Sequence, residues 1–372
     1  MPDSSTLDIA PIYIDNDDQL AACCEQWSRA DVLALDTEFI RTDTFFPIAG
    51  LIQVSDGNGI YLIDPLRIET FSPFAELLVD TRIIKLLHSC SEDLDVFESL
   101  LGVLPTPLLD TQVGAALAGI GFGMGYQRMI ETLLDIHVPK GETRSDWLQR
   151  PLTESQIHYA ALDVAHLHEV YSLLHQVLSD HERIDSWYEE GERLVERYRH
   201  NNTVDDYYLR VKSAWRLSSE QLSVLQAVTR WREQQARQRN IPRGRVLKDN
   251  VCLSIAQQMP NSMAQLSQVD DLSPKQARVH GGILLALVDE ARNQSEQPAL
   301  LDSPLPAELN RKLKQLRAWV NARAEQLVIC PEILLGKKEL EAILRTGIWP
   351  EGAGNWRREL LAKDILREHN NE

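Results

Sequence analysis

Four carboxylates in this 372-residue sequence have the spacing needed to hold divalent cations. Asp36 and Glu38 stand two apart at the end of a short apolar run, residues 32–36, and alternate residues of a strand point to the same side. Asp93 and Asp163 follow in two segments with helical patterns. Mg²⁺ and Mn²⁺ prefer such hard oxygen ligands, and two acids in an apolar strand are costly unless a cation neutralises them. The four carboxylates therefore predict a site for two divalent metals, of the kind that activates water against a phosphodiester.

Each of these acids also has an explanation that involves no metal. Asp36 and Glu38 are compatible with an ordinary solvated strand end. The helix dipole alone favours Asp93, because this residue lies in the first turn of its helix. Asp163 follows Tyr159 by four residues, so the two side chains are expected to meet on one flank of a helix in an ordinary buried hydrogen bond.

The segment before Asp163 offers two candidates for orienting or activating the attacking water. Tyr159 and Asp163 are about 40° apart around a helix, whereas His158 and Asp163 are about 140° apart. Thr153 and Gln156 form a capping-box pattern, which predicts that the helix has already begun at His158. We therefore expect Tyr159 to face the carboxylates, with His158 as the alternative.

The elements that must position these residues alternate between strand-like and helix-like segments over residues 1–178. Apolar runs at 50–55, 60–64 and 82–88 predict strands. Asp56-Gly-Asn-Gly59 predicts a hairpin turn and hence at least one antiparallel pair. Ser91 is a suitable N-cap for the next helix. The fold prediction is an α/β domain with a mixed sheet flanked by helices.

Beyond this domain no strand pattern competes with the helical one. We expect a helical connector over 179–213, a helical domain over 214–293, a linker over 294–306 and a second helical domain over 307–372. The two helical domains have similar lengths and landmarks. They are expected to be all-α bundles.

The charge is divided unequally along the chain. The net charge is −17, but residues 1–200 carry 34 Asp and Glu against 13 Lys and Arg, while the remainder carries 21 against 25. An acidic half can hold cations, and a more basic half can meet phosphate. Basic residues concentrate at 230–248, where contacts to nucleic-acid phosphates would give affinity without sequence specificity. The candidate phosphate contacts are Arg232, Arg237, Arg239, Arg243, Arg245 and Lys248, with Lys140 and Arg144 as further candidates in the first half.

Other features exclude several classes of protein. No apolar stretch is long enough to span a membrane, and the N-terminus lacks the pattern of a secretory signal. The five cysteines include no Cys-x-x-Cys pair, which suits a reducing compartment and predicts no zinc site. We expect a cytoplasmic protein.

At this point a family resemblance is clear. Asp36-Thr-Glu38, the segment Ser-Glu-Asp93-Leu and Tyr159-Ala-Ala-Leu-Asp163 resemble the three motifs of the four-carboxylate exonuclease superfamily, in its tyrosine subclass. The stretch Arg144-Ser-Asp-Trp-Leu-Gln-Arg-Pro-Leu152 is similar to bacterial ribonuclease D. The resemblance implies a ribonuclease-H-like sheet, with Asp36, Glu38, Asp93 and Asp163 as metal ligands and Tyr159 as a catalytic residue.

The helical half carries a resemblance of its own. Trp231-Arg232, Asn240-Ile-Pro242 and Val246-Leu247 resemble the small HRDC domain shared by RecQ-type helicases and ribonuclease D, and residues 307–372 look like a divergent second copy. The two resemblances together imply a 3′→5′ exoribonuclease that releases 5′-mononucleotides and trims transfer RNA precursors. We expect it to be monomeric. A DNA exonuclease and an inactive RNA-binding scaffold are the alternatives, and the presence of all four carboxylates and Tyr159 argues against the scaffold.

Overall fold

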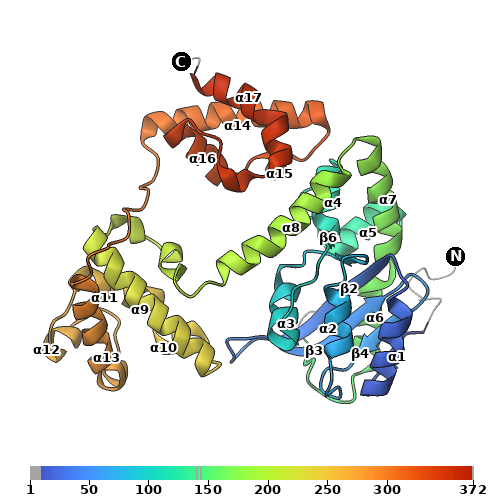
Figure 1. Ribbon diagram of the computed structural model, residues 1–372, viewed down its shortest axis with the longest axis horizontal. Helices are drawn as coiled ribbons and strands as arrows, with labels where there is room; N and C mark the ends of the chain where they lie inside the picture. The colour runs from blue at the N-terminus through green and yellow to red at the C-terminus, as the bar shows by residue number, and fades with distance from the viewer. Residues whose placement is uncertain (1–9, 140, 143–144, 371–372) are drawn as a thin grey trace. The chain divides into compact units, whose positions relative to one another are not determined.

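A mixed six-stranded sheet lies at the centre of the N-terminal half in the computed structural model, which describes residues 10–139, 141–142 and 145–370 (Figure 1). The sheet order is β1-β4-β3-β2-β5-β6; β3 is antiparallel to β2 and β4, and the other pairs are parallel. The predicted α/β class is confirmed. The strands are β1 (Ile12–Ile14), β2 (Val32–Ile40), β3 (Ile48–Ser55), β4 (Ile60–Ile63), β5 (Ile84–Leu87) and β6 (Leu108–Asp110).

The turn between β3 and β4 forms where the sequence predicts a hairpin. The Asp56 carboxylate accepts hydrogen bonds from the backbone N–H groups of Asn58 and Gly59, at 3.0 and 2.8 Å. Gly57 has φ +83°, a left-handed conformation that glycine adopts without strain. This turn fixes the register in which β3 pairs with β4.

Helices cover both faces of the sheet. On one face Trp27 of α1 packs edge-on against Tyr61 of β4 and Phe74 of α2. On the other face Ala160 of α6 packs with Leu62 of β4. The helices of this part are α1 (Asp17–Trp27), α2 (Ser72–Leu78), α3 (Ser91–Leu101), α4 (Thr111–Leu117), α5 (Tyr126–Leu134), α6 (Glu154–Ala165), α7 (Leu167–Asp180) and α8 (Ile184–Asn201).

Two helix starts matter for the carboxylates. Thr153 caps α6 in a complete capping box with Gln156, so the predicted start is confirmed and His158 is helical. The predicted cap Ser91 is instead the first residue of α3, and Cys90 occupies the cap position without a side-chain hydrogen bond. This one-residue difference leaves Asp93 in the first turn.

The chain forms two compact units. Unit 1 comprises residues 1–40, 47–196 and 305–372, and unit 2 comprises residues 41–46 and 197–304. The C-terminal helical segment is thus part of the same compact unit as the sheet. Its elements are α14 (Ala307–Leu327), α15 (Pro331–Leu334), α16 (Lys337–Thr346), the short 3₁₀ turn η3 (Glu351–Ala353) and α17 (Asn355–Asn370).

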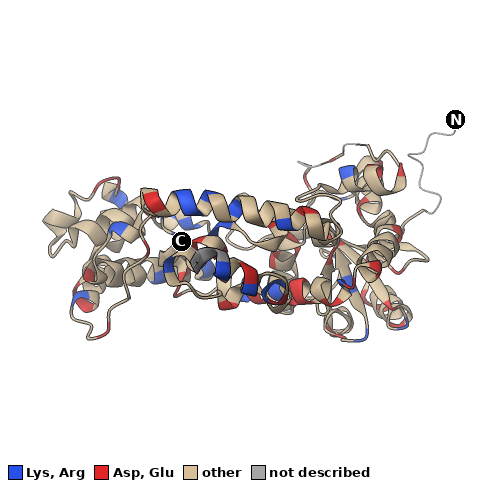
Figure 2. Cartoon of the chain, turned by 90° about the horizontal axis from the view of Figure 1, so that it is seen from above, with Lys and Arg blue, Asp and Glu red and all other residues tan. Residues whose placement is uncertain are grey.

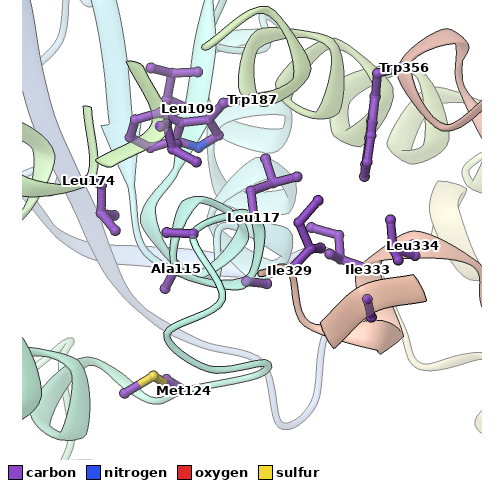
Figure 3. Packing of buried hydrophobic residues seen from close by; sticks show 14 of the residues in the cluster. Leu109, Ala115, Leu117, Met124, Leu174, Trp187, Ile329, Ile333, Leu334 and Trp356 are labelled. Atoms are coloured by element: carbon purple, nitrogen blue, oxygen red, sulfur yellow. The ribbon is translucent and has the colours of Figure 1, made fainter. Parts of the chain in front are cut away.

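A continuous apolar core joins the α/β part of unit 1 to the C-terminal helical segment (Figure 3). Leu117 of α4 belongs to the same buried cluster as Ile329 and Ile333. The Glu190 carboxylate of α8, only 4% exposed, accepts hydrogen bonds from Trp356 Nε1 at 2.9 Å and from the Arg357 guanidinium. A buried carboxylate of this kind is costly unless it is paired, so these contacts stabilise the packing of α17.

Unit 2 is a separate helical bundle. Its core is formed by Leu225 and Val228 of α9 with Ile255 of α11 and Leu284 of α13. Capping boxes start α9 at Ser218 and α13 at Ser273. The helical elements are η1 (Tyr207–Arg210), η2 (Ala214–Arg216), α9 (Ser219–Gln238), α10 (Arg243–Val246), α11 (Asp249–Gln258), α12 (Met263–Leu266) and α13 (Pro274–Arg292).

The loop that connects β2 to β3, residues 41–46, belongs to unit 2. Phe45, 5% exposed, packs with Ala236 and Val246. The side chain of Asn240 accepts hydrogen bonds from the backbone N–H groups of Phe45 and Phe46, both at 3.0 Å. The strand that carries Asp36 and Glu38 therefore runs directly into a segment that is fixed within the helical bundle.

Within the residues that the structure describes, no helix combines the length and the apolar composition required to cross a bilayer.

Candidate active site

Strand β2 and helix α6 bring three of the four predicted carboxylates together. One oxygen each from Asp36, Glu38 and Asp163 lies within 4.8 Å of the others. Asp36 and Glu38 are alternate residues of β2, so both side chains point to the face that α6 covers. The register between β2 and β3 shifts directly after Glu38, which ends the regular pairing at the site.

Asp93 completes the group from α3. Its side chain is 6% exposed, and its negative charge lies near enough to Asp36 and Asp163 to raise their pKa values. The hydroxyl of Thr37, also buried, donates a hydrogen bond of 2.5 Å to Asp93 Oδ1. Thr37 therefore holds one oxygen of Asp93. Sequence reasoning missed this threonine, although it stands between Asp36 and Glu38.

Burial and mutual repulsion disfavour the ionised form of all four acids. Burial, followed by the charges of neighbouring carboxylates, raises the pKa of Asp36 well above its usual range and that of Glu38 to about 9. Burial also raises the pKa values of Asp93 and Asp163 to about 7, although hydrogen bonds from Thr37 and Tyr159 lower them in part. Bound cations would reverse this effect by neutralising the carboxylates. Clustered hard oxygen donors fit Mg²⁺ or Mn²⁺.

Tyr159 lies beside the carboxylates as the helical spacing predicts. Its phenol lies close enough to the Asp163 carboxylate for each group to shift the pKa of the other. Burial and the charges of Asp163 and Glu38 raise the pKa of the phenol, so Tyr159 is neutral and remains a donor. A Cβ atom on Gly141 would overlap the Tyr159 ring at 1.9 Å, so only glycine fits against this face of the ring.

His88, the residue directly after β5, has a structural environment. Its Nδ1 lies 2.9 Å from the hydroxyl of Thr111, and its ring packs edge-on against Tyr126. Burial lowers its pKa, so the ring is neutral. The candidate phosphate contacts Lys140 and Arg144 lie outside the described residues.

The six predicted phosphate contacts of unit 2 fall into distinct environments. Arg232 is 1% exposed, and its guanidinium pairs with Asp249 at 2.7 Å. Arg237 and Arg243 are half-buried, and their guanidinium groups lie 5.0 and 4.5 Å from the centre of the Phe45 ring. The Arg232 side chain is thus fully used in contacts within unit 2. The side chains of Arg237 and Arg243 are partly used in this way.

The other three basic residues are exposed. Arg239, Arg245 and Lys248 line a hollow of about 460 Å³, together with Lys275 and His280 of α13. Arg245 also pairs with Asp43 of the 41–46 loop. Lys275 and His280 lie outside the basic segment 230–248 and were missed because they join it only through the packing of α13 on α9.

Exposed basic residues also occur on α14. Arg311, Lys314 and Arg317 are exposed and recur every three residues, so they share one side of the helix. Figure 2 shows basic residues following one another along this long helix. The spacing could have been recognised in the sequence, where no acidic residue separates these three.

Comparison with known proteins identifies the family. A family model described as 3′-5′ exonuclease matches residues 11–179, and one described as HRDC domain matches residues 221–288. The chain is 46% identical to ribonuclease D of Pseudomonas paraeruginosa over 95% of its own length and 96% of that protein. The chain belongs to the ribonuclease D family. It is also 35% identical to ribonuclease D of Escherichia coli, over 96% of this chain and 98% of that one.

The structure agrees with this assignment. It superposes on the crystal structure of Escherichia coli RNase D with a TM-score of 0.88 at 33% identity, covering 97% of this chain and 98% of the other. As a ribonuclease D homologue, the protein is a 3′→5′ exoribonuclease, a hydrolase that acts on RNA and uses divalent metal. The predicted family, fold and enzyme class are confirmed.

Proposed function

We propose that this ribonuclease D homologue trims the 3′ ends of transfer RNA precursors and other structured RNAs, releasing 5′-mononucleotides with the help of two Mg²⁺ or Mn²⁺ ions. The observation that carries the mechanism is the convergence of Asp36, Glu38 and Asp163 within 4.8 Å beside the buried Asp93. The Escherichia coli relative is described as an exoribonuclease involved in structured RNA processing, which supports the proposed substrate class. We further propose that the protein acts as a cytoplasmic monomer.

Each residue of the site has a stated role in this proposal. Asp36, Glu38, Asp93 and Asp163 hold the two cations, which when bound supply an activated water and neutralise the leaving 3′ oxygen. Thr37 keeps one oxygen of Asp93 in a fixed orientation through its 2.5 Å hydrogen bond.

Tyr159 orients the attacking water. Its phenol lies beside Asp163, and the raised pKa keeps its proton in place for donation. A neutral phenol is suited to orienting a water molecule, whereas a general base must first lose its own proton. Tyr159 is therefore a positioning group for the nucleophile.

The exposed basic hollow of unit 2 provides the proposed contact with RNA phosphates. Arg239, Arg245, Lys248 and Lys275 all line it, and phosphate contacts of this kind give affinity that falls steeply with salt. Arg232 is left out of this surface because it is buried and paired.

A labelled-substrate experiment tests the proposed function. A transfer RNA precursor with a 3′ extension and a DNA strand of the same sequence, both 5′-labelled, are incubated with the protein in Mg²⁺, in Mn²⁺ or in EDTA. We expect stepwise 3′ shortening of the RNA, dependence on metal, and a loss of several orders of magnitude in turnover for Asp36→Asn. Near-normal activity of Asp36→Asn would contradict the metal site, and equal degradation of DNA would favour a DNA exonuclease.

A further inference from the structure

Gln53, in the middle of β3, has a fully buried side chain without hydrogen-bond partners. Its exposed fraction is 0%, and among the described residues neither Oε1 nor Nε2 has a partner. A buried polar group that makes no hydrogen bond opposes folding, because it has given up its bonds to water. A carboxamide at this position therefore requires a reason other than stability of the strand.

Of the two residues directly opposite Gln53, one carries a polar group with which an amide can form a hydrogen bond. On β4 its directly opposite neighbour is Leu62, which packs with Leu51 and Ala160 in an apolar cluster. On β2 its directly opposite neighbour is Asp36. Directly opposed residues of an antiparallel pair point to the same face with Cβ atoms about 4.5–5.5 Å apart. The Gln53 amide thus lies between an apolar cluster and a predicted metal ligand.

We propose that Gln53 is a positioning residue: its Nε2, which has no partner in the described part of this structure, donates a hydrogen bond to the Asp36 carboxylate when that carboxylate binds the cation. This inference rests on the proposed metal site. A carboxylate ligand uses one lone pair for the metal and can accept hydrogen bonds through the others. A donor outside the ligand set fixes the orientation of the carboxylate, and loss of such a partner typically lowers metal affinity or activity 10–100-fold.

The chemistry of an amide suits this role better than that of a charged donor. Lys or Arg at position 53 would neutralise Asp36 and compete with the cation for its charge. The neutral amide of Gln53 orients the carboxylate and leaves its charge for the metal. The length of the glutamine side chain also allows Nε2 to reach across one strand spacing of about 4.7–4.9 Å.

Gln156 shows what a buried structural glutamine looks like in the same protein. Its side chain is 1% exposed, like that of Gln53. Its Oε1 accepts hydrogen bonds from Thr153 N and Gln149 Nε2 at 3.0 and 2.7 Å, and its Nε2 donates to Asp146 O at 3.1 Å. Gln156 is therefore the matched control for a purely structural amide.

Two measurements on Gln53→Leu test the proposal, with Gln53→Met as a second variant that preserves side-chain length. In EDTA, both variants should unfold at a temperature a few degrees higher than the parent, because an unpaired buried amide has been replaced by apolar atoms. Mn²⁺ binding followed by calorimetry should be 10–100-fold weaker. For Gln156→Leu, the unfolding temperature should instead fall.

The outcomes separate this inference from the proposed function. Asp36→Asn is measured in parallel and should lose most Mn²⁺ affinity. If Asp36→Asn loses the metal while Gln53→Leu and Gln53→Met bind it as the parent does, Gln53 has no positioning role and the inference is overturned. If Asp36→Asn binds Mn²⁺ normally, the metal site itself is misassigned.

Discussion

Replacing Glu38 by Gln should stabilise the metal-free protein in neutral and mildly alkaline solution. Burial and the charges of Asp163 and Asp93 raise the pKa of Glu38 from 4.5 to about 9. The folded protein therefore binds this proton more tightly than the unfolded chain does. The Glu38 contribution to stability is fully present below the unfolded pKa and is lost as the pH rises towards the folded pKa.

The size of the effect follows from the two pKa values. At pH values between the unfolded and the folded pKa, the folding free energy that is lost because of Glu38 grows by about 1.36 kcal/mol for each pH unit. At about pH 7.5, roughly three units above the unfolded pKa, ionisable Glu38 costs up to about 4 kcal/mol of folding free energy. Entry of water and rearrangement of side chains relieve part of this cost, so the value is an upper limit. Gln has no proton to lose, and its neutral side chain avoids the penalty.

Urea unfolding in EDTA at a series of pH values measures the difference. The parent and Glu38→Gln should have similar stabilities near pH 5, and the variant should become increasingly more stable as the pH rises. Added Mn²⁺ should reduce or reverse the difference in unfolding free energy between the parent and Glu38→Gln, because a cation that binds only the folded parent stabilises it. Glu98→Gln, an exposed change on α3, is the control and should alter stability by less than about 0.5 kcal/mol. Parallel pH profiles for the parent and Glu38→Gln would refute the reasoning.

Two further predictions concern catalysis and RNA binding. Tyr159→Phe should lower turnover by ~10²–10⁴-fold with little change in RNA affinity, as measured by single-turnover kinetics, because one water-orienting hydroxyl is removed and the ring remains. His158→Ala should retain most activity. An active Tyr159→Phe together with an inactive His158→Ala would instead assign the orientation of the attacking water to the histidine. Arg239→Ala and Lys248→Ala should each reduce the slope of log affinity against log salt by about 1, because each variant binds one RNA phosphate fewer. Unchanged slopes in filter-binding titrations would place the RNA path elsewhere.

Local sequence patterns were enough to predict most of what positions the carboxylates. Alternation along 32–38 put Asp36 and Glu38 on one face, and the Thr153 capping box set the phase of α6 so that Tyr159 meets Asp163. The hairpin turn at Asp56–Gly59 was likewise predicted from four consecutive residues. These inferences depend only on neighbouring residues, so a single sequence contains the information they require.

Features that depend on pairing between distant segments were not predictable in the same way. The three-residue strands β1 and β6 are too short to give a periodic pattern. Arg232 resembles its basic neighbours in the sequence, and only the packing of α9 shows that it is buried. The environment of Gln53 depends on the register that places it opposite Asp36.

The discontinuous composition of unit 1 has a consequence for the order in which the protein matures during synthesis. Unit 2 is complete once residue 304 has been translated, whereas unit 1 requires the segment from Leu305 onwards. At translation rates of ~5–20 residues per second, that segment takes roughly 3–14 seconds to make. During this interval Leu117 lacks the apolar partners that α15 supplies, and Glu190 lacks Arg357. The helical bundle encoded in the middle of the chain can therefore fold while the nuclease unit that begins ahead of it is still incomplete.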